Sequence, residues 1–470
     1  MSTRTAYGDS TPSYLSFWPR VREFAVPPSM IETATARREA GDWAGACAAA
    51  RVDVDLDLRS VARIHGRDLA ARIRDDLRHL APDLLRWHMP RIAPHGLLRP
   101  GLTIPLARYD ADEPGRAGPV HLVARTPPAR ADGGQRIALA LWDGFSQTAA
   151  RGHPHPHPSR RFRLDLHRHL WDARRAGELR IRSGADRSPP PAPNAPASDV
   201  PVPVPSLVPE GCRCAVDRWA AEAGHLLRAE RRSDGPVAVR VGPRRRLLLD
   251  VTGGGATASA WRIASVSPDG GGSCVPVLPD AATWVLPDLD LLRAGAIEAD
   301  RLHPLVASAL VPDHVPSGTS SPREDPVARE RFVECRGARH RIGLVDGVLA
   351  ALDHDADEVR REELLMALSG TPLPCLRAID EAHRRPECLV GVRERLHHGD
   401  IAGALVVVEG LLGPGAVLRG GALRDALEAA AERRIAYGLF RAGMAVPAPH
   451  RACPAPSRPR GYRPHPRHAR

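Results

Sequence analysis

The 470-residue sequence contains no lysine, so its 66 lysine-plus-arginine positions are all arginine. Without lysine, a chain cannot form the Schiff base that holds pyridoxal phosphate, and it cannot build a phosphate-binding loop of the G-x-x-x-x-G-K type. The strand lysine of protein kinases and the asparagine of their catalytic loop are missing as well. These absences exclude pyridoxal-phosphate enzymes, ordinary P-loop ATPases and ordinary protein kinases.

Asparagine, glutamine and aromatic residues are also scarce. The chain has one asparagine, two glutamines and only 4% aromatic residues, beside 47 prolines and 41 glycines. Such a composition is typical of G+C-rich coding sequences, so the number of arginines is not by itself a sign of guanidinium chemistry. The length predicts roughly two to four domains of about 100–200 residues each, and the proline and glycine content predicts long linkers.

The net charge and the cysteine content indicate which cellular compartment and which binding partners to expect. The net charge of +11 permits binding to nucleic acid or acidic proteins, although part of it lies in the acid-free tail from Arg451 to Arg470. Eight dispersed cysteines give no disulfide framework. The first residues do not form a secretory signal, and the most apolar stretch, Ile401 to Leu418, is interrupted by Glu409 and Pro414. We therefore predict a cytoplasmic protein without a membrane segment.

Proline-rich stretches divide the chain. Residues 188–209 have proline at almost every second or third position, which favours an extended polyproline spacer, and residues 312–326 form a second, weaker linker. The predicted units are 1–187 (helical hairpin plus β unit), 210–311 (α+β unit) and 327–446 (β-hairpin plus helical unit). We expect the basic tail, 447–470, to be disordered.

A helical motif occurs near both ends of the chain. The segment Gly41-Asp42-Trp-Ala-Gly-Ala matches Gly399-Asp400-Ile-Ala-Gly-Ala. In each copy a helix (34–40 or 392–398) should end at the glycine, the aspartate should cap the next helix, and a longer helix (70–85 or 423–439) should follow. The pattern predicts a partial internal repeat of helical hairpins.

A second repeat is rich in β-strands and carries arginine at equivalent positions. Three alternating strand–turn–strand segments begin near residues 121, 237 and 332. Each has an arginine at the end of its first strand and another at the start of its second. The six residues are Arg125, Arg136, Arg240, Arg246, Arg336 and Arg341.

These arginine pairs are the candidate binding site for an anion or a partner. In the last copy the alternation predicts Arg336 and Arg341 on one solvent face, close together across the turn. Like charges that face each other across strands destabilise a sheet, and a bidentate anionic partner would relieve the repulsion. The alternative is that they are solvated strand ends, neutralised by Glu334 or by the acidic stretch that follows each hairpin, such as Asp353 to Glu358.

Other motifs are weaker. Gly253 to Ala258 fits a dinucleotide-binding loop, but a glycine-rich hairpin turn explains it better because no further βα units follow. A zinc set of Cys375, Cys388, His397 and His398 has no common spacing, so we predict no metal. A helix-turn-helix at 61–77 lacks its expected apolar position, since Arg72 stands there. No G-x-S-x-G elbow or H-E-x-x-H helix is present, and no cofactor is expected.

The segments Gly41-Asp-Trp-Ala-Gly-Ala and Leu77-Arg-His-Leu-Ala-Pro-Asp-Leu-Leu-Arg-Trp-His88, with the overall composition, resemble uncharacterised proteins of high-G+C actinobacteria. This resemblance implies no catalytic residues, because such proteins have no established activity. We predict a multidomain α+β protein with helical hairpins and small antiparallel β-hairpin or meander units. Its predicted function is non-enzymatic: an interaction or scaffold protein whose arginine-lined faces bind a protein or anionic partner. The alternatives are a nucleic-acid-binding protein and a metal-assisted enzyme.

Overall fold

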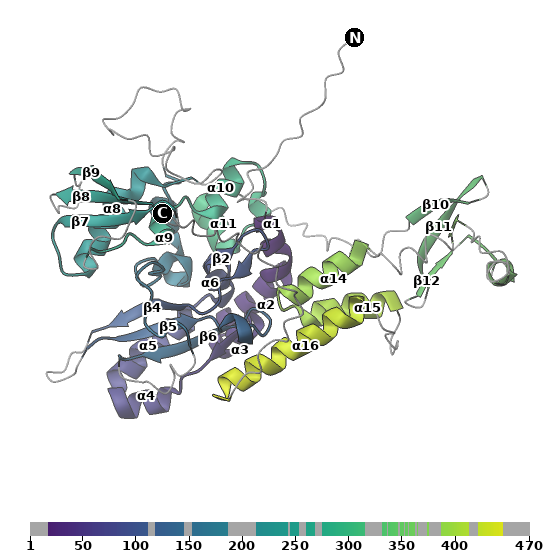
Figure 1. Cartoon of the computed structure of the whole chain (residues 1–470), viewed down its shortest axis with the longest axis horizontal. Helices are drawn as coiled ribbons and strands as arrows, with labels where there is room; N and C mark the ends of the chain where they lie inside the picture. Colours follow the sequence, from purple (N-terminus) through teal and green to yellow (C-terminus); the bar gives the residue numbers. More distant parts are fainter. Residues whose placement is uncertain are drawn as a thin grey trace, which may run out of the picture.

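The computed structural model of the chain combines helices with small sheets, which confirms the α+β class (Figure 1). It describes residues 17–110, 118–144, 153–186, 213–242, 245–252, 260–267, 275–314, 331–335, 337–345, 348–351, 353–355, 357–361, 364, 374–375, 387–412 and 422–444. The predicted linker 188–209 and the predicted tail 447–470 lie outside these residues, as does the linker 312–326 from residue 315 onward.

The largest core forms around a four-stranded mixed sheet of order β1-β6-β5-β4. β1 runs parallel to β6, and the other neighbours are antiparallel. The bounds are β1 (Val52–Val54), β4 (Thr103–Tyr109), β5 (Val120–Arg125) and β6 (Ile137–Trp142), with a separate hairpin of β2 (Arg91–Ile92) and β3 (Leu97–Leu98). Apolar side chains such as Ile104, Leu122 and Leu139 are fully buried in the sheet.

Helices of the first third pack against this sheet. They are α1 (Trp18–Arg20), the π-helix η1 (Val21–Ala25), α2 (Pro28–Glu39), α3 (Trp43–Ala49), α4 (Leu58–His65), α5 (Arg67–His79) and α6 (Pro82–His88). Short 3-10 turns and one helix follow: η2 (Ala129–Ala131), η3 (Arg168–Leu170), η4 (Ala173–Glu178) and α7 (Leu179–Ser183). Asp57 begins α4 by accepting the backbone N–H of Ser60 at 3.0 Å, the usual N-cap bond. α5 buries Leu69, Ile73 and Leu77 in the core.

The end of the predicted middle unit joins this first core. The segment contains α10 (Pro287–Arg293), η6 (Ala299–Arg301) and α11 (Pro304–Leu310). Its Leu291 and Val306 belong to the same buried cluster as the first third of the chain. A buried pair, His303 Nε2 with Asp83 at 2.8 Å, ties α11 to α6. Residues from about 286 to 311, which the sequence assigns to the middle unit, therefore pack on the first core.

The middle unit has a core of its own. The antiparallel sheet β7-β8-β9 has strands β7 (Gly235–Arg240), β8 (Arg246–Thr252) and β9 (Ala260–Ser267), and it packs with α8 (Val216–Ala229) and α9 (Asp280–Thr283). Val237 and Val239 on β7 face Trp219 and Leu226 of α8 inside this cluster. Because β8 and β9 pair antiparallel, the glycine-rich segment 253–259 joins two hairpin strands. The hairpin interpretation of these glycines is thus confirmed, although the segment itself lies outside the described residues.

The described residues of the last third include a sheet and the helices α14, α15 and α16. The sheet β10-β11-β12 is formed by β10 (Arg331–Cys335), β11 (Ala338–Val345) and β12 (Val348–Ala351). The helices α14 (Glu387–His397), α15 (Ile401–Leu412) and α16 (Ala422–Arg441) share a small cluster around Val392, Ala404 and Ala430. α16 runs beside the first core, while β10–β12 lie at the far end of the molecule (Figure 1).

Both Gly-Asp turns form as the sequence predicts. Asp42 accepts the N–H of Gly45 at 2.8 Å, and Asp400 accepts that of Gly403 at 3.2 Å. The glycines before them adopt left-handed conformations, with φ of +78° at Gly41 and +82° at Gly399. The two turns share a geometry, while a common repeated unit stays a prediction.

The second turn also docks on the first core. Arg51 donates hydrogen bonds to the main-chain oxygen of His398 at 2.8 Å and to Asp400 at 3.0 Å. At Gly399 the backbone approaches Gly134 so closely that an added Cβ would lie 1.9 Å from the Gly134 oxygen. The C-terminal helices therefore cover a face of the first core formed by residues far away in the sequence.

None of the helices in the described ranges combines the length and the apolar character that crossing a bilayer requires.

Candidate functional site

In the first hairpin, the candidate arginines take part in internal structure. The guanidinium of Arg136 donates two hydrogen bonds to the carboxylate of Asp53, at 2.7 and 2.8 Å. The same carboxylate accepts the hydroxyl of Tyr437 at 2.5 Å. Arg125, at the end of β5, is only 9% exposed, and burial lowers its pKa. Neither arginine presents an open binding face.

In the last hairpin, Arg341 is also engaged. Its backbone N–H and guanidinium both bond to Asp353, at 2.7 and 2.8 Å, and Asp353 begins the acidic stretch that follows the hairpin. The register pairs Arg341 with Phe332, and the hairpin closes at Cys335 and Ala338. Arg336 lies outside the described residues, between these two positions. The alternative interpretation, in which the acidic stretch after the hairpin neutralises the arginine, therefore accounts for Arg341.

The middle hairpin differs from the other two, because its arginines face each other. Arg240 and Arg246 are directly opposite across β7 and β8. The neighbours Val239 and Leu247 are fully buried, so both arginines lie on the opposite, outer face of the sheet. Burial and then repulsion from Arg161 and Arg246 lower the pKa of Arg240. The sequence predicts such a facing pair in the last hairpin, and the structure has one in the middle hairpin.

A pocket lies beside this pair, between the first core and the middle unit. Its cavity volume is about 330 Å³. The wall is aromatic, with Phe17, Trp18, Phe162 and Trp284, and the charged lining side chains are five arginines and one aspartate: Arg91, Arg99, Arg161, Arg163, Arg213 and Asp280. The charges of Arg161, Asp280 and Arg99 in this lining act on Arg240 together with that of Arg246.

Three of the five lining arginines have carboxylate partners. Arg161 pairs with Asp280 at 2.7 Å, Arg163 with Asp165 at 2.7 Å and Arg213 with Asp290 at 2.6 Å. Such partners compensate their charge, so the excess positive charge comes from the two other arginines.

Arg91 and Arg99 have no carboxylate partner within the described ranges. The guanidinium of Arg91 donates to the main-chain oxygens of Gly96 at 2.8 Å and Arg86 at 2.7 Å, and its Nε has no acceptor there. Burial lowers the pKa of Arg91 to about 9, so it is still a cation at neutral pH. An anion that enters the pocket would find this charge uncompensated in a poorly hydrated wall.

Family models, curated proteins and solved structures give no match to this chain. The function must therefore be argued from the site alone.

One polar pair lies under the pocket. His88, which lines it, directs Nδ1 at the main-chain oxygens of Leu84 and Leu170, so Nδ1 carries a proton. Its Nε2 lies 3.3 Å from Asp288, whose carboxylate also accepts the indole N–H of Trp87 at 2.9 Å. All three side chains are almost fully buried. The contacts of His88 and Asp288 hold α6 against α10. Among the described residues that line the pocket there is no serine or cysteine that this pair could orient as a nucleophile.

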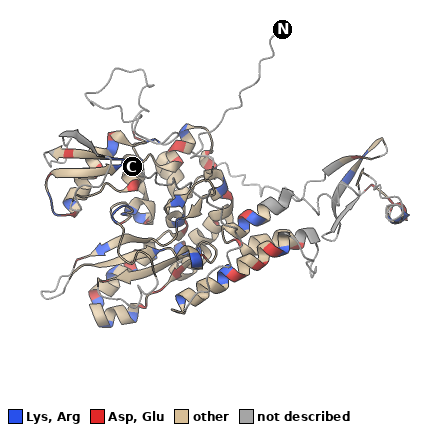
Figure 2. Ribbon diagram, in the orientation of Figure 1, with Lys and Arg blue, Asp and Glu red and all other residues tan. Residues whose placement is uncertain are grey.

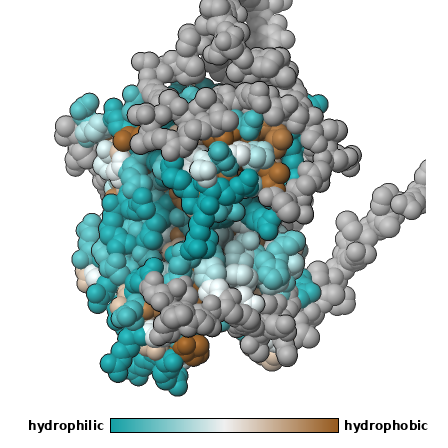
Figure 3. All heavy atoms as spheres, turned by 90° about the vertical axis from the view of Figure 1, so that its left-hand side faces the viewer, coloured by the Kyte–Doolittle hydropathy of each residue, from teal (hydrophilic) through white to brown (hydrophobic). Residues whose placement is uncertain are grey.

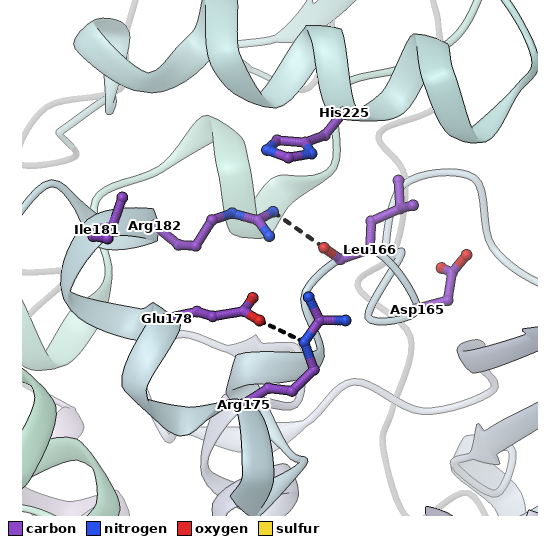
Figure 4. Close-up of a pocket in the computed structure, with 7 residues that line it drawn as sticks. All are labelled: Asp165, Leu166, Arg175, Glu178, Ile181, Arg182 and His225. Atoms are coloured by element: carbon purple, nitrogen blue, oxygen red, sulfur yellow. Dashed lines mark hydrogen bonds and ion pairs between the residues drawn. The ribbon is translucent and has the colours of Figure 1, made fainter. Parts of the chain in front are cut away.

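A second pocket, between α7 and α8, is electrostatically balanced (Figure 4). Arg175 bonds to Glu178 at 2.6 Å, and Arg182 points at the main-chain oxygen of Leu166 while holding Glu222 at 2.6 Å (Figure 4). The nearby imidazole of His167 and the hydrogen bonds from Arg182 lower the pKa of Glu222 despite its burial. Since these charges satisfy one another, this pocket lacks the excess charge of the first.

Charged and apolar residues are mixed in the parts of the chain that Figures 2 and 3 show. Basic and acidic residues alternate along α16 and over the first core (Figure 2). On the side that carries β7–β9, the coloured surface is mostly hydrophilic with small separate apolar patches (Figure 3). The arginine-rimmed pocket is therefore a local feature.

Sequence reasoning found the middle arginine pair and missed the pocket. The aromatic wall comes from Trp18, Phe162 and Trp284, which are far apart in the chain and belong to no motif. Of the zinc set that the sequence offers but does not favour, Cys375 lies with Cys335 and His354. His398 is instead buried against the first core beside Phe24, with ring centroids 6.3 Å apart. The side chain of Cys388 lies outside the described residues.

Proposed function

We propose that this chain is a non-enzymatic interaction protein that binds an acidic segment of a protein partner at the arginine-rimmed pocket. The observation that carries the proposal is the uncompensated charge of Arg91, Arg99, Arg240 and Arg246 beside an aromatic cavity. Charge-assisted hydrogen bonds to carboxylates are about twice as strong as neutral ones, and arginine presents them in a bidentate geometry.

The size and lining of the cavity define the partner. A volume of about 330 Å³ with walls of Trp18 and Trp284 accepts one large apolar side chain. Flanking carboxylates would then meet Arg91 inside and the Arg240–Arg246 pair outside. The expected partner motif is an aromatic anchor between acidic residues.

Peptide binding tests this proposal directly. The probe is a short fluorescein-labelled peptide with a central tryptophan flanked by glutamates, titrated with the full chain at low salt. We expect saturable binding that weakens as salt rises, and Arg240→Gln with Arg246→Gln to weaken it roughly tenfold, or about 1.4 kcal/mol. Trp284→Ala should remove the preference for the aromatic peptide over a polyglutamate peptide.

Arg59→Gln is the matched control, since Arg59 is exposed on α4, away from this pocket. It removes one positive charge, as each of the two pocket substitutions does, and should leave binding unchanged. Absence of binding at low salt, or equal losses in the control and the pocket variants, would contradict the proposal.

A nucleic-acid function is the second candidate, because Arg240 and Arg246 face outward together on a sheet surface. Phosphate contacts would give binding to duplex DNA or RNA that falls steeply with salt. If the same double variant abolishes nucleic-acid binding while the acidic peptide does not bind, the second candidate replaces the first. A cytoplasmic location belongs to the proposal, and the thiols of Cys47, Cys335 and Cys375, which are not in disulfides, support it.

A further inference from the structure

We infer that Cys335, His354 and Cys375, joined by His340, form a structural zinc site that holds the β10–β12 unit together. One ligand atom from each of the first three residues lies within 4.8 Å of the others. Ligand atoms around a tetrahedral zinc ion are about 3.4–3.8 Å apart, given Zn–S and Zn–N bonds of about 2.3 and 2.0 Å. A contraction of roughly an ångström would therefore complete the shell.

The fold brings these residues to one face of the hairpin. His340 pairs directly with Val333, and direct cross-strand partners have their side chains on the same face. Cys335 lies two residues after Val333 on the same strand, so it shares that face as well. His354 follows β12, and Cys375 packs against Cys335 and Val333.

The imidazoles present unused nitrogens to this group. The side chain of His354 is only 3% exposed, and its buried Nε2 has no hydrogen-bond partner. Its Nδ1 lies 3.4 Å from the carboxylate of Glu358. A zinc-ligating histidine commonly donates its second ring N–H to a carboxylate in this way, which orients the ligating nitrogen.

His340 is placed to supply the fourth ligand. Its ring stacks on that of His354, with centroids 4.2 Å apart and an angle of 9° between the planes. The Nδ1 of His340 is also buried without a hydrogen-bond partner. His340 lies outside the group of three whose ligand atoms are within 4.8 Å, so its ring must move for Nδ1 to bind the metal.

The small core of the unit gives a physical reason for a metal ion. Among its described side chains, the buried hydrophobic cluster consists of Cys335 and Cys375, with Val333 against them. A core of two thiols buries little apolar surface, and small units of this kind commonly obtain their stability from a structural metal.

The identity of the metal follows from the ligands. Two thiolates and two imidazoles in a tetrahedral arrangement favour zinc, and two thiolate charges neutralise its two positive charges. Burial, and then the hydrogen bond with Cys335, raise the pKa of the Cys375 thiol to about 11. Zinc binds cysteine as the thiolate, so binding would release the thiol protons to solvent.

Metal analysis of the full chain, purified under reducing conditions, tests the inference. We expect about one zinc ion per chain, as for a closed structural site. Replacement by cobalt should produce thiolate-to-cobalt charge-transfer bands and the visible spectrum of a tetrahedral ion. The cobalt spectrum needs no variant, so it remains decisive even if a substitution unfolds the unit.

Variants distinguish this site from adventitious binding by the His153–His157 segment or the histidines of the tail. Cys335→Ser and Cys375→Ser should each lose the metal. Cys47→Ser, at a buried free cysteine of the first core, is the matched control and should keep it. The inference is overturned if the chain is metal-free after incubation with zinc, if a Cys335–Cys375 disulfide forms in place of metal binding, or if the bound metal persists in both cysteine variants.

Discussion

Arg136 and Asp53 form a bidentate ion pair, with hydrogen bonds of 2.7 and 2.8 Å between residues 83 positions apart. Tyr437 of α16 donates its hydroxyl to the same carboxylate, and Arg441 lies 3.3 Å from it. Although burial raises the pKa of Asp53, the hydrogen bonds from Arg136 and Tyr437 hold it below its ordinary value. Arg136, a candidate binding residue in the sequence, therefore belongs with Asp53 to the group of side chains that holds α16 on the first sheet.

Replacing Asp53 should release α16 from the first core. Asp53→Ala leaves Arg136 and Tyr437 without their acceptor, and we expect a loss of about 2–3 kcal/mol in the free energy of unfolding. Urea unfolding measures the loss, and amide hydrogen exchange in 422–441 locates it. Glu428→Ala removes the exposed partner of Arg424 on the same helix and should change stability by less than about 1 kcal/mol. Equal effects of the two changes would argue against this fastening.

The two Gly-Asp turns provide a matched comparison. Alanine at Gly41 or Gly399 must adopt a left-handed φ, which costs about 1–2 kcal/mol. A Cβ at Gly41 meets no atom within 4 Å, whereas at Gly399 it meets the Gly134 oxygen at 1.9 Å. Gly399→Ala should therefore lower the melting temperature clearly more than Gly41→Ala. If the two substitutions have the same effect, the docking of the second turn on Gly134 does not stabilise the chain.

Acid should destabilise the same interface through His398. Burial, followed by repulsion from Arg91 and Arg86, lowers the pKa of this fully buried imidazole to about 3, from 6.5. Between these pH values the unfolded chain binds a proton at His398 that the folded chain does not. Stability is lost as pH falls through this window, by about 1.4 kcal/mol per pH unit for one proton.

The substitution His398→Leu should reduce this slope by about one proton, as seen in urea unfolding at a series of pH values. His95→Gln, at an exposed histidine, is the control and should leave the slope unchanged. An unaltered slope in His398→Leu would show that His398 is protonated equally in both states.

The zinc site should depend on Glu358. Because this carboxylate lies 3.4 Å from Nδ1 of His354, Glu358→Gln should weaken zinc binding by roughly 10–100-fold without removing a ligand. Competition with a chromophoric chelator measures the affinity. Asp357→Asn changes the neighbouring exposed carboxylate and should have little effect. A similar loss in both variants would point to general charge rather than to orientation of His354.

Local features of the fold could be predicted from the sequence. The Gly-Asp turns form as predicted because the capping bond of Asp42 or Asp400 reaches only three residues along the chain. Strand pairs such as β7 and β8 follow from alternation and a short turn. The parallel pairing of β1 with β6 was not predictable in this way, because it depends on packing between distant segments.

The partners of charged and metal-binding side chains were harder to predict. Equivalent positions in the sequence marked Arg240 and Arg246 as a pair, but nothing local indicates that Asp53 neutralises Arg136. Likewise, Cys335, His354 and Cys375 have no close pair that would give a zinc-binding spacing. In the sequence, Cys388 is the nearest possible second ligand to Cys375. In the fold, the residues beside Cys375 are Cys335 of β10 and His354, which follows β12.

The docking of α16 has a consequence for biosynthesis. Asp53, Arg51 and Gly134 emerge early from the ribosome, but Tyr437 and Gly399, which cover them, are made last. A polar face of the first sheet therefore stays uncovered while the middle unit and β10–β12 are synthesised. This face is covered only after residues 399–441 are synthesised, so a chain that stops before them would leave it exposed.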